Sequence, residues 1–168
     1  VKLDRFGFIG SSTMYPNVSH AVKEEEAFVS EPHPLYAGVG WMKRYSEKVI
    51  EYYNNISNTK FGMIRTTAIY GHHDAFNETG HAITQLKHKA DSKMNPFEVW
   101  GDGKQIRDFI YVDDVVDGLL TVVEKNPTAT PYNIATGNGT TITELVTTIT
   151  RLFGYEPKFN YDLTKPVM

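Results

Sequence analysis

The segment 99–115 constrains the fold of this chain more than any other part of its sequence. An apolar strand ends at Trp100, and the dipeptide Asp102-Gly103 that follows favours a tight hairpin turn. Apolar and polar residues then alternate over 106–111, which predicts a return strand. We therefore expect a β-hairpin in which Trp100 faces the returning strand.

Strands and helices alternate along the chain. Asp113 is placed to cap a helix over Val115–Glu124, and Thr141 with Glu144 forms a capping box for a helix that ends before Gly154. Further strands are expected at Phe6–Gly10, Phe61–Arg65, Tyr132–Ala135 and Lys158–Tyr161, further helices at Leu35–Tyr53 and His81–Lys93, and loops at 16–34 and 66–80. The alternation predicts an α/β fold with a parallel sheet. The acidic run Glu24-Glu25-Glu26 is expected to be a solvated face.

Composition narrows the functional class. The chain of 168 residues can bury a sizeable core, and its 40% hydrophobic and 22% charged residues are ordinary for a globular protein. A net charge of −3 does not favour nucleic-acid or membrane-surface binding. There is no cysteine, which excludes disulfides, thiolate metal sites and a thiol nucleophile and fits a reducing compartment, so we expect a cytoplasmic protein.

The first residues suggest a piece of a longer protein. The chain starts at Val1 and enters Phe6–Gly10, which resembles a central strand, almost at once. The one early G-x-G, at Gly38 and Gly40, follows no strand and has Lys43 where the last glycine of a dinucleotide-binding turn would stand. We expect the cofactor-binding turn to lie upstream, and the chain to be inactive by itself because missing strands would expose a sheet edge.

Arg107 and Trp100 suggest a ligand. Arg107 lies among apolar residues of its strand, where an unpaired guanidinium is costly, and its planar fork suits phosphate. Trp100 offers a flat face for a base or sugar. The segment resembles the substrate-nucleotide segment of the extended short-chain dehydrogenases that process nucleotide sugars, the NAD-dependent epimerase/dehydratase family.

The resemblance extends in matching order from about Phe8 to Pro166, through the segments Gly10–Pro16, Tyr70–His81 and Tyr161–Pro166. It is greatest to members that form GDP-fucose by epimerising and then reducing a 4-keto-6-deoxy GDP-sugar. The family implies the C-terminal part of a Rossmann-like doubly wound parallel sheet plus a small α/β substrate-binding subdomain. We expect residues 1–70 to belong to the cofactor-binding domain, and 71–168 mainly to the substrate-binding subdomain, with some segments returning to the main sheet.

The resemblance also implies residue roles. Ser11 would hydrogen-bond the sugar carbonyl, and Tyr36 would give a proton to the C4 oxygen as hydride arrives from NADP(H) or NAD(H). Thr13 stands where these enzymes commonly have an acid–base cysteine, and His81 stands where they have its partner in C3/C5 inversion. Substrate binding would fall to Lys89, Trp100 and Arg107, and cofactor binding to Tyr36, Lys43, Thr66 and Thr67.

The chain departs from the family pattern beside its tyrosine. The lysine expected four residues after Tyr36 is absent, and that position is Gly40. A phenol with a pKa of about 10 needs a nearby cation to donate a proton at neutral pH. Lys43, seven residues after Tyr36, falls on the same helical face and is our candidate for that cation. The alternative is an ordinary solvent-facing lysine and weakened redox chemistry.

Other departures leave alternatives open. Thr13 is a far weaker acid than a thiol, so epimerisation through it would be impaired. The chain would then belong to a catalytically impaired nucleotide-sugar binding protein, or to a 4-epimerase or 4,6-dehydratase. Thr13-Met14 does not supply the Asp-Glu pair that a dehydratase needs. His81 has a structural alternative as a loop anchor or helix cap.

Two further groups have structural interpretations. His72-His73 lacks a suitably spaced third ligand, so we expect no metal site. The aromatic residues at helical spacing within Leu35–Tyr53 are expected in the core or in a subunit contact. In related enzymes this helix pairs with its copy, which implies a homodimer. These aromatic residues are Trp41, Tyr45, Tyr52 and Tyr53.

Overall fold

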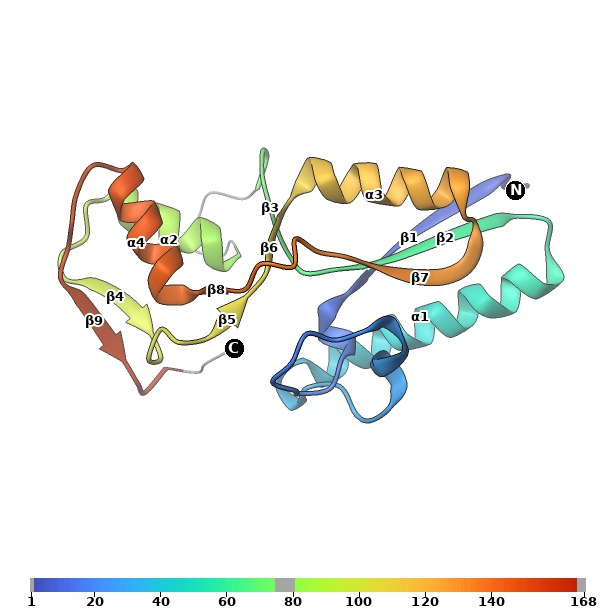
Figure 1. The fold of residues 1–168 in the computed structure, drawn as a ribbon, viewed down its shortest axis with the longest axis horizontal. Coiled ribbons are helices and arrows are strands. Elements are labelled where there is room, and N and C mark those ends of the chain that lie inside the picture. The colour runs from blue at the N-terminus through green and yellow to red at the C-terminus, as the bar shows by residue number, and fades with distance from the viewer. Residues whose placement is uncertain (1, 75–80, 166–168) are drawn as a thin grey trace. The chain divides into compact units, whose positions relative to one another are not determined.

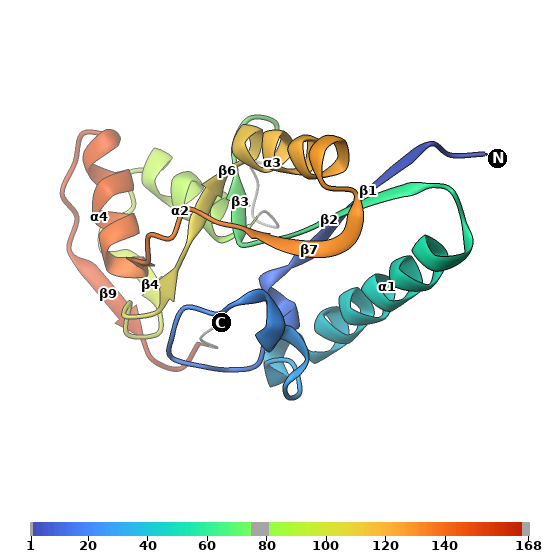
Figure 2. The same ribbon diagram turned by 45° about the vertical axis from the view of Figure 1, so that its right-hand side comes forward.

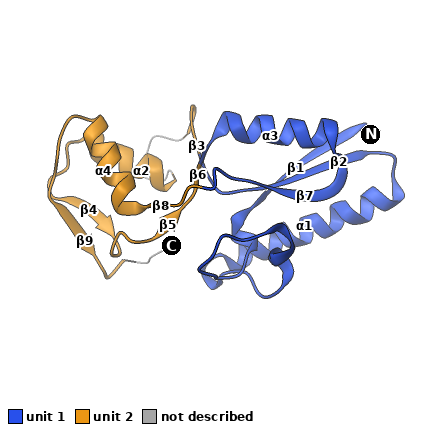
Figure 3. Ribbon diagram, viewed as in Figure 1, with its two compact units in different colours: residues 1–69, 110–137 blue, residues 70–109, 138–168 orange. Residues whose placement is uncertain are grey.

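The computed structural model describes residues 2–74 and 81–165, and its fold is α/β, as expected (Figure 1). The chain forms two compact units (Figure 3). Unit 1 comprises residues 1–69 and 110–137, and unit 2 comprises residues 70–109 and 138–168. The chain therefore leaves unit 1, forms part of unit 2, returns, and leaves again.

Unit 1 contains a three-stranded parallel sheet in the order β1 (Arg5–Ser11), β2 (Lys60–Thr66), β7 (Thr128–Ile134). Ser11 lies opposite Thr66 at the carboxyl ends of the first two strands. The expected parallel pairing is thus confirmed. The expected central position of the first strand is wrong within the described residues, because β2 is the middle strand and is buried along almost its whole length.

Two helices cover opposite faces of this sheet, α1 (Ala37–Ile56) and α3 (Val112–Lys125) (Figures 1 and 2). Alternation along β2 directs Met63 to a core cluster with Ile50 of α1, and Ile64 to a cluster with residues of α3. Glycine at position 62 permits the close approach of α3, because a Cβ there would lie 2.7 Å from a side-chain carbon of Val123.

The expected start of α3 is wrong. The helix begins at Val112, directly after β6 (Phe109–Tyr111), and Tyr111 occupies its N-cap. Asp113 therefore lies inside the first turn, where its charge favours the helix dipole, instead of capping the helix. The strand runs into the helix without a capping turn.

The loop 16–34 contains the short 3₁₀ helix η2 (Glu24–Phe28), and its acidic run is not simply solvated. The Oε1 atom of Glu24 accepts a hydrogen bond from the backbone N–H of Asn133 at 2.8 Å. Glu26 accepts one from the N–H of Lys23 at 2.8 Å and contacts Nε2 of His20 at 2.6 Å. These two carboxylates satisfy local donors, which a count of charges does not reveal.

Unit 2 contains the parallel pair β4 (Phe97–Trp100) and β9 (Phe159–Asp162) and the antiparallel pair β5 (Ile106–Arg107) and β8 (Thr140–Thr141). Strand β3 (Ala68–Tyr70) pairs with β6 where the chain passes between the units. Helices α2 (Ala82–Asp91) and α4 (Ile142–Leu152) contribute to a core around Phe97 and Val146. The predicted capping box is confirmed, since Thr141 and Glu144 exchange hydrogen bonds.

The predicted hairpin after Trp100 is wrong. In the described residues β4 pairs with β9 and β5 pairs with β8, not with each other. Gly101 and Gly103 do turn the chain through positive φ, but their backbone groups bond elsewhere. The N–H of Gly101 donates to Asp162 at 2.9 Å, and the carbonyl of Gly103 accepts from the N–H of Thr143 at 3.0 Å. Partners distant in sequence have replaced the local one.

The aromatic residues of α1 do not form the core. Tyr45 is 71% exposed, and Trp41, Tyr52 and Tyr53 are each about half exposed, so the core interpretation of this stripe is wrong. The buried positions of α1 are instead Gly40, Arg44, Glu47 and Ile50. Among the described helices, none has the length and apolar character needed to cross a bilayer.

Candidate active site

Ser11 and Thr13 lie together where β1 ends. Ser11 caps the 3₁₀ helix η1 (Ser12–Met14), and its Oγ accepts hydrogen bonds from the backbone N–H of Thr13 at 3.2 Å and from Thr13 Oγ1 at 3.0 Å. A hydroxyl that accepts two hydrogen bonds keeps its own O–H to donate. Ser11 is therefore arranged to donate a hydrogen bond to a carbonyl oxygen at the end of the sheet.

Thr66 and Thr67 follow at the end of the neighbouring strand. Thr66, opposite Ser11, is 4% exposed, and among the described residues its Oγ1 atom has no hydrogen-bond partner. Buried hydroxyls are normally paired. The carboxyl end of β2 thus offers an unused polar group beside Ser11.

Tyr36 and Lys43 come from η3 (Pro34–Tyr36) and α1. Tyr36 occupies the N-cap of α1, and its ring centroid lies 5.7 Å from that of His33. Lys43 Nζ donates a hydrogen bond to the carbonyl of Ile9 at 2.8 Å and lies 5.1 Å from the ring centroid of Phe8. The Lys43 ammonium is therefore directed at β1 close to Ser11.

Position 40 has no room for the family's lysine. A Cβ on Gly40 would lie 2.6 Å from the carbonyl oxygen of Thr13 and 2.6 Å from Cβ of Pro32. The backbone of the Ser11–Thr13 segment thus approaches α1 at the point where a lysine side chain would begin. Lys43 is the nearest lysine along α1. Four residues before it stands Val39, which has no proton to donate.

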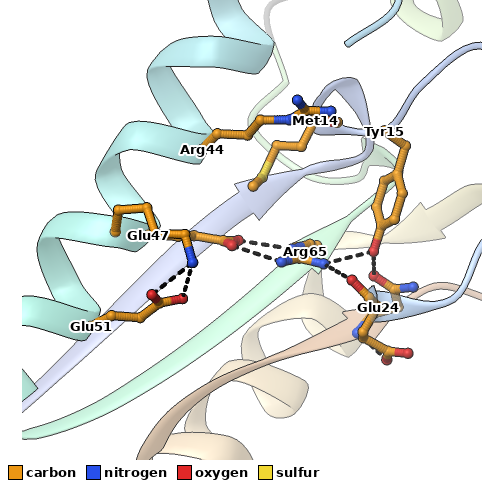
Figure 4. Close-up of polar contacts among 9 residues, drawn as sticks. Met14, Tyr15, Glu24, Arg44, Glu47, Glu51 and Arg65 are labelled. Carbon is orange, nitrogen blue, oxygen red and sulfur yellow. Dashed lines mark hydrogen bonds and ion pairs between the residues drawn. The ribbon is translucent and has the colours of Figure 1, made fainter. Parts of the chain in front are cut away.

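A buried polar cluster beside these residues escaped the sequence analysis. Arg65 of β2 and Glu47 of α1 form an ion pair, with Nη2 and Oε2 2.7 Å apart (Figure 4). Arg65 also donates to the Tyr15 hydroxyl at 3.0 Å. The signal was present, because an arginine inside an apolar strand requires a partner, as we argued for Arg107.

Burial and pairing act on the pKa values of this cluster. Burial raises the pKa of Tyr15 and outweighs the opposing effect of its hydrogen bond from Arg65, so the phenol stays neutral. Burial alone would lower the pKa of Arg65, but the hydrogen bonds and charge of Glu47 raise it overall. The guanidinium therefore remains charged.

Trp100 lies among charged side chains in unit 2. Its side chain is 43% exposed, and the ammonium nitrogens of Lys89 and Lys165 lie 6.0 Å and 5.7 Å from its ring. Lys89 Nζ donates to Glu98 Oε2 at 2.9 Å, and this hydrogen bond lowers the pKa of Glu98. Arg107 lies on β5 opposite Thr140, so it shares no strand pairing with Trp100.

His81 occupies the N-cap of α2, and its carbonyl accepts a hydrogen bond from Thr84 Oγ1 at 2.7 Å. Six residues of the loop before it, 75–80, lie outside the described residues. His72 and His73 have ring centroids 6.2 Å apart. In residues 2–74 and 81–165, no three potential metal-ligating side chains of His, Asp or Glu gather.

The candidate residues fall into two sets. The structure brings Ser11 and Thr13 together and directs Lys43 at their strand, and in the second set it brings Lys89 to Trp100. The first set, in unit 1, is Ser11, Thr13, Tyr36, Lys43, Thr66 and Thr67, and the second, in unit 2, is His81, Lys89, Trp100 and Arg107.

Known proteins resemble this chain over nearly its whole length. GDP-L-colitose synthase of Yersinia pseudotuberculosis is 32% identical over 95% of the chain, and GDP-L-fucose synthase of Escherichia coli is 30% identical over 95%. The chain covers 54% of each of these proteins, so it spans about half the length of the curated relatives it matches.

Solved structures share the fold. A GDP-L-fucose synthetase from Naegleria fowleri bound to NADP has a TM-score of 0.87 at 23% identity, over 98% of this chain and 55% of its own. A UDP-glucose 4-epimerase from Thermotoga maritima, with UDP-glucose, has a TM-score of 0.78 at 25% identity, over 94% of this chain and 50% of its own. Residues 1–135 match the model of the NAD dependent epimerase/dehydratase family, and the chain belongs to that family.

Proposed function

We propose that the protein carrying this chain is an NAD(P)-dependent nucleotide-sugar epimerase/reductase that acts on a GDP-4-keto-6-deoxy sugar. The observation that carries the proposal is the meeting of Ser11, with an O–H left to donate, and the Lys43 ammonium at the end of one strand. Relatives named GDP-L-fucose synthase and GDP-L-colitose synthase support the substrate class.

In this mechanism Ser11 donates a hydrogen bond to the C4 carbonyl oxygen of the sugar and polarises it. Tyr36 gives a proton to that oxygen as it gains negative charge. Lys43 supplies the positive charge that favours proton loss from a phenol. His81 and Thr13 are the candidates for moving protons at C3 and C5, where hydrogens next to a ketone are acidic enough for a histidine to remove.

The residues at the strand ends fit the nicotinamide end of NADP or NAD. Lys43 offers an ammonium and Thr66 a buried hydroxyl without a partner in the described residues, and both groups suit the hydroxyls of a ribose. When bound, the cofactor supplies the hydride for reduction at C4. Tyr36, Lys43, Thr66 and Thr67 would hold it.

Trp100, Lys89 and Arg107 form the proposed nucleotide subsite. The exposed indole suits stacking with a base, and Lys89 and Lys165 near it supply charge that attracts a diphosphate. Arg107 adds a planar fork for bidentate phosphate binding. The second unit would then select the nucleotide while the first carries the chemistry, which fits a division near residue 70.

The exposed aromatic stripe of α1 supports a homodimer. A patch of large apolar side chains on one helix commonly marks a protein interface. The side chains that would pair with a second copy include Trp41, Tyr45, Tyr52 and Tyr53. We propose a cytoplasmic enzyme, in keeping with the absence of cysteine and the expected supply of nucleotide sugars.

A second function rests on Gly40 and Val39. Because position 40 excludes a side chain and Val39 lacks a proton, the tyrosine–lysine spacing of the family is lost. A protein that binds a nucleotide sugar without turning it over is therefore the second candidate. Its substrate-side residues Trp100 and Arg107 would serve binding alone.

One experiment separates the two functions. The complete gene product is incubated with NADPH and GDP-4-keto-6-deoxymannose, and absorbance of NADPH is followed. Oxidation of NADPH with formation of a reduced GDP-sugar supports the enzyme. Binding of the GDP-sugar by calorimetry without oxidation supports the silent protein and contradicts our proposal.

A further inference from the structure

The ion pair between Glu47 and Arg65 is fully enclosed by the protein. Their side chains are 0% and 3% exposed. Arg65 Nε donates to Glu47 Oε1 at 2.8 Å, and Nη2 donates to Oε2 at 2.7 Å. A bidentate pair fixes the orientation of both groups as well as their distance. The pair therefore ties α1 to β2 one residue before Thr66.

The remaining donors of Arg65 hold the segment that follows Ser11. Nη1 donates to the Tyr15 hydroxyl at 3.0 Å and to the carbonyl of Glu24 at 2.7 Å. The Tyr15 hydroxyl in turn donates to Asn133 Oδ1 of β7 at 2.6 Å. Figure 4 shows Glu47 on one side of Arg65, with Tyr15 and Glu24 on the other. One guanidinium thus links α1, β2, η2 and the end of η1.

A second arginine fixes the same segment from α1. Arg44, three residues before Glu47, is 2% exposed, and its Nε and Nη2 donate to the carbonyl of Met14 at 2.9 Å and 2.7 Å. The chain after Ser11 is therefore held at Met14 by Arg44 and at Tyr15 by Arg65. These contacts fix the backbone on which Ser11 and its neighbour Thr13 stand.

We propose that Glu47 and Arg65 are positioning residues that hold Ser11 in the geometry needed for hydride transfer. The proposal rests on the proposed function. A buried ion pair is costly to desolvate, and apolar residues of similar volume are often as stabilising. Apolar residues lack the directed donors to Tyr15 and Glu24. The chain therefore gains placement from this pair more than stability.

The decisive variant replaces both members in the full-length protein, Glu47→Met with Arg65→Met. We expect a melting temperature close to that of the wild type, because no charge is left unpaired. Turnover should fall about 100-fold, the effect of a misplacement near 1 Å. KM for the GDP-sugar should stay unchanged, because the nucleotide subsite lies in unit 2. The control is Glu51→Gln, which removes the exposed pair with Lys48 on the same helix.

Hydrogen exchange provides a readout that does not depend on activity. The N–H of Tyr15 donates to the carbonyl of Ser12 at 3.1 Å, so this amide is protected in the native segment. Exchange in the peptide 11–16 should be faster in the double variant than in the wild type or in Glu51→Gln. If wild-type protein oxidises no NADPH, the proposed function fails, and exchange still tests whether the pair holds the segment.

Arg65→Lys covers the case in which the double variant does not fold. It keeps the charge beside Glu47 but loses the planar fork, and we expect the same loss of turnover and faster exchange at 11–16. A folded double variant with wild-type turnover and exchange would overturn the proposal. So would an Arg65→Lys protein with wild-type values for both measurements.

Discussion

Lys43 Nζ donates a 2.8 Å hydrogen bond to the carbonyl of Ile9, two residues before Ser11 on the same strand. A side chain seven residues after Tyr36 is thereby brought back to the strand end that carries the candidate serine. The Gly40 backbone, pressed against Thr13, leaves this as the arrangement that supplies a cation.

Replacing Lys43 by methionine tests that arrangement. Lys43→Met keeps the length of the side chain and removes its charge, so we expect turnover of the full-length protein to fall about 100-fold or more. The alkaline limb of the pH–rate profile should also move, because the phenol loses its neighbouring cation. Steady-state NADPH oxidation across pH measures both. Lys48→Met on the outer face of α1 is the control, and unchanged kinetics in Lys43→Met would contradict the role.

Tyr36→Phe tests the proton donor. The substitution removes only the hydroxyl, and we expect turnover to fall about 100-fold, as for loss of a general acid. KM for the GDP-sugar should change little. Tyr45→Phe, at a highly exposed site on the same helix, is the matched control. If Tyr36→Phe retains full turnover, another group protonates the C4 oxygen.

Gly40→Ala should destabilise the protein although alanine is the better helix former. The new methyl would lie 2.6 Å from Thr13 O and Pro32 Cβ, and such overpacking costs about 1–3 kcal/mol. Gly38→Ala is the control, because a Cβ there meets nothing within 4 Å and should stabilise α1 by up to about 1 kcal/mol. Urea denaturation measures both. Equal and stabilising effects of the two substitutions would show that position 40 has room.

Trp100→Ala should weaken GDP binding to the full-length protein. Stacking of a base on an aromatic side chain is worth about 1–3 kcal/mol, which corresponds to a Kd raised about 5- to 150-fold. Isothermal titration with GDP measures the change. Leu152→Ala, an exposed apolar site of the same unit, is the control. A Kd within error of the wild type would exclude Trp100 from the nucleotide subsite.

Local signals predicted much of the fold because they act within a few residues. The capping box of Thr141 and Glu144, the strand Phe61–Arg65 and the long helix after Tyr36 all form close to the expected positions. The hairpin after Trp100 failed for a physical reason. Asp102-Gly103 specifies a turn, but whether two strands pair is decided by competing partners such as β9, which lies far away in sequence.

Long-range contacts also explain what the sequence analysis missed at the site. The spacing of Arg44 and Glu47 resembles that of a solvated helix face, and only the fold brings Arg65 and the Met14 carbonyl to them. The exposed aromatic stripe then lies on the other side of the helix. Periodicity identified the two faces of α1 but assigned the wrong one to the core, because buried charges that find partners are invisible to a hydrophobicity pattern.

The Lys89–Glu98 pair predicts how unit 2 responds to acid. The hydrogen bond from Lys89 holds the pKa of Glu98 below its ordinary value of 4.5. A carboxylate with a lowered pKa stabilises the folded state above that ordinary value, and the contribution is lost as pH falls through the lowered pKa. Because the pair is partly exposed, its contribution should be less than about 1 kcal/mol. Lys89→Met should raise the pKa of Glu98 in an NMR titration, whereas Lys104→Met should not. An unchanged Glu98 titration in Lys89→Met would mean that Lys89 is free to bind phosphate without releasing a carboxylate.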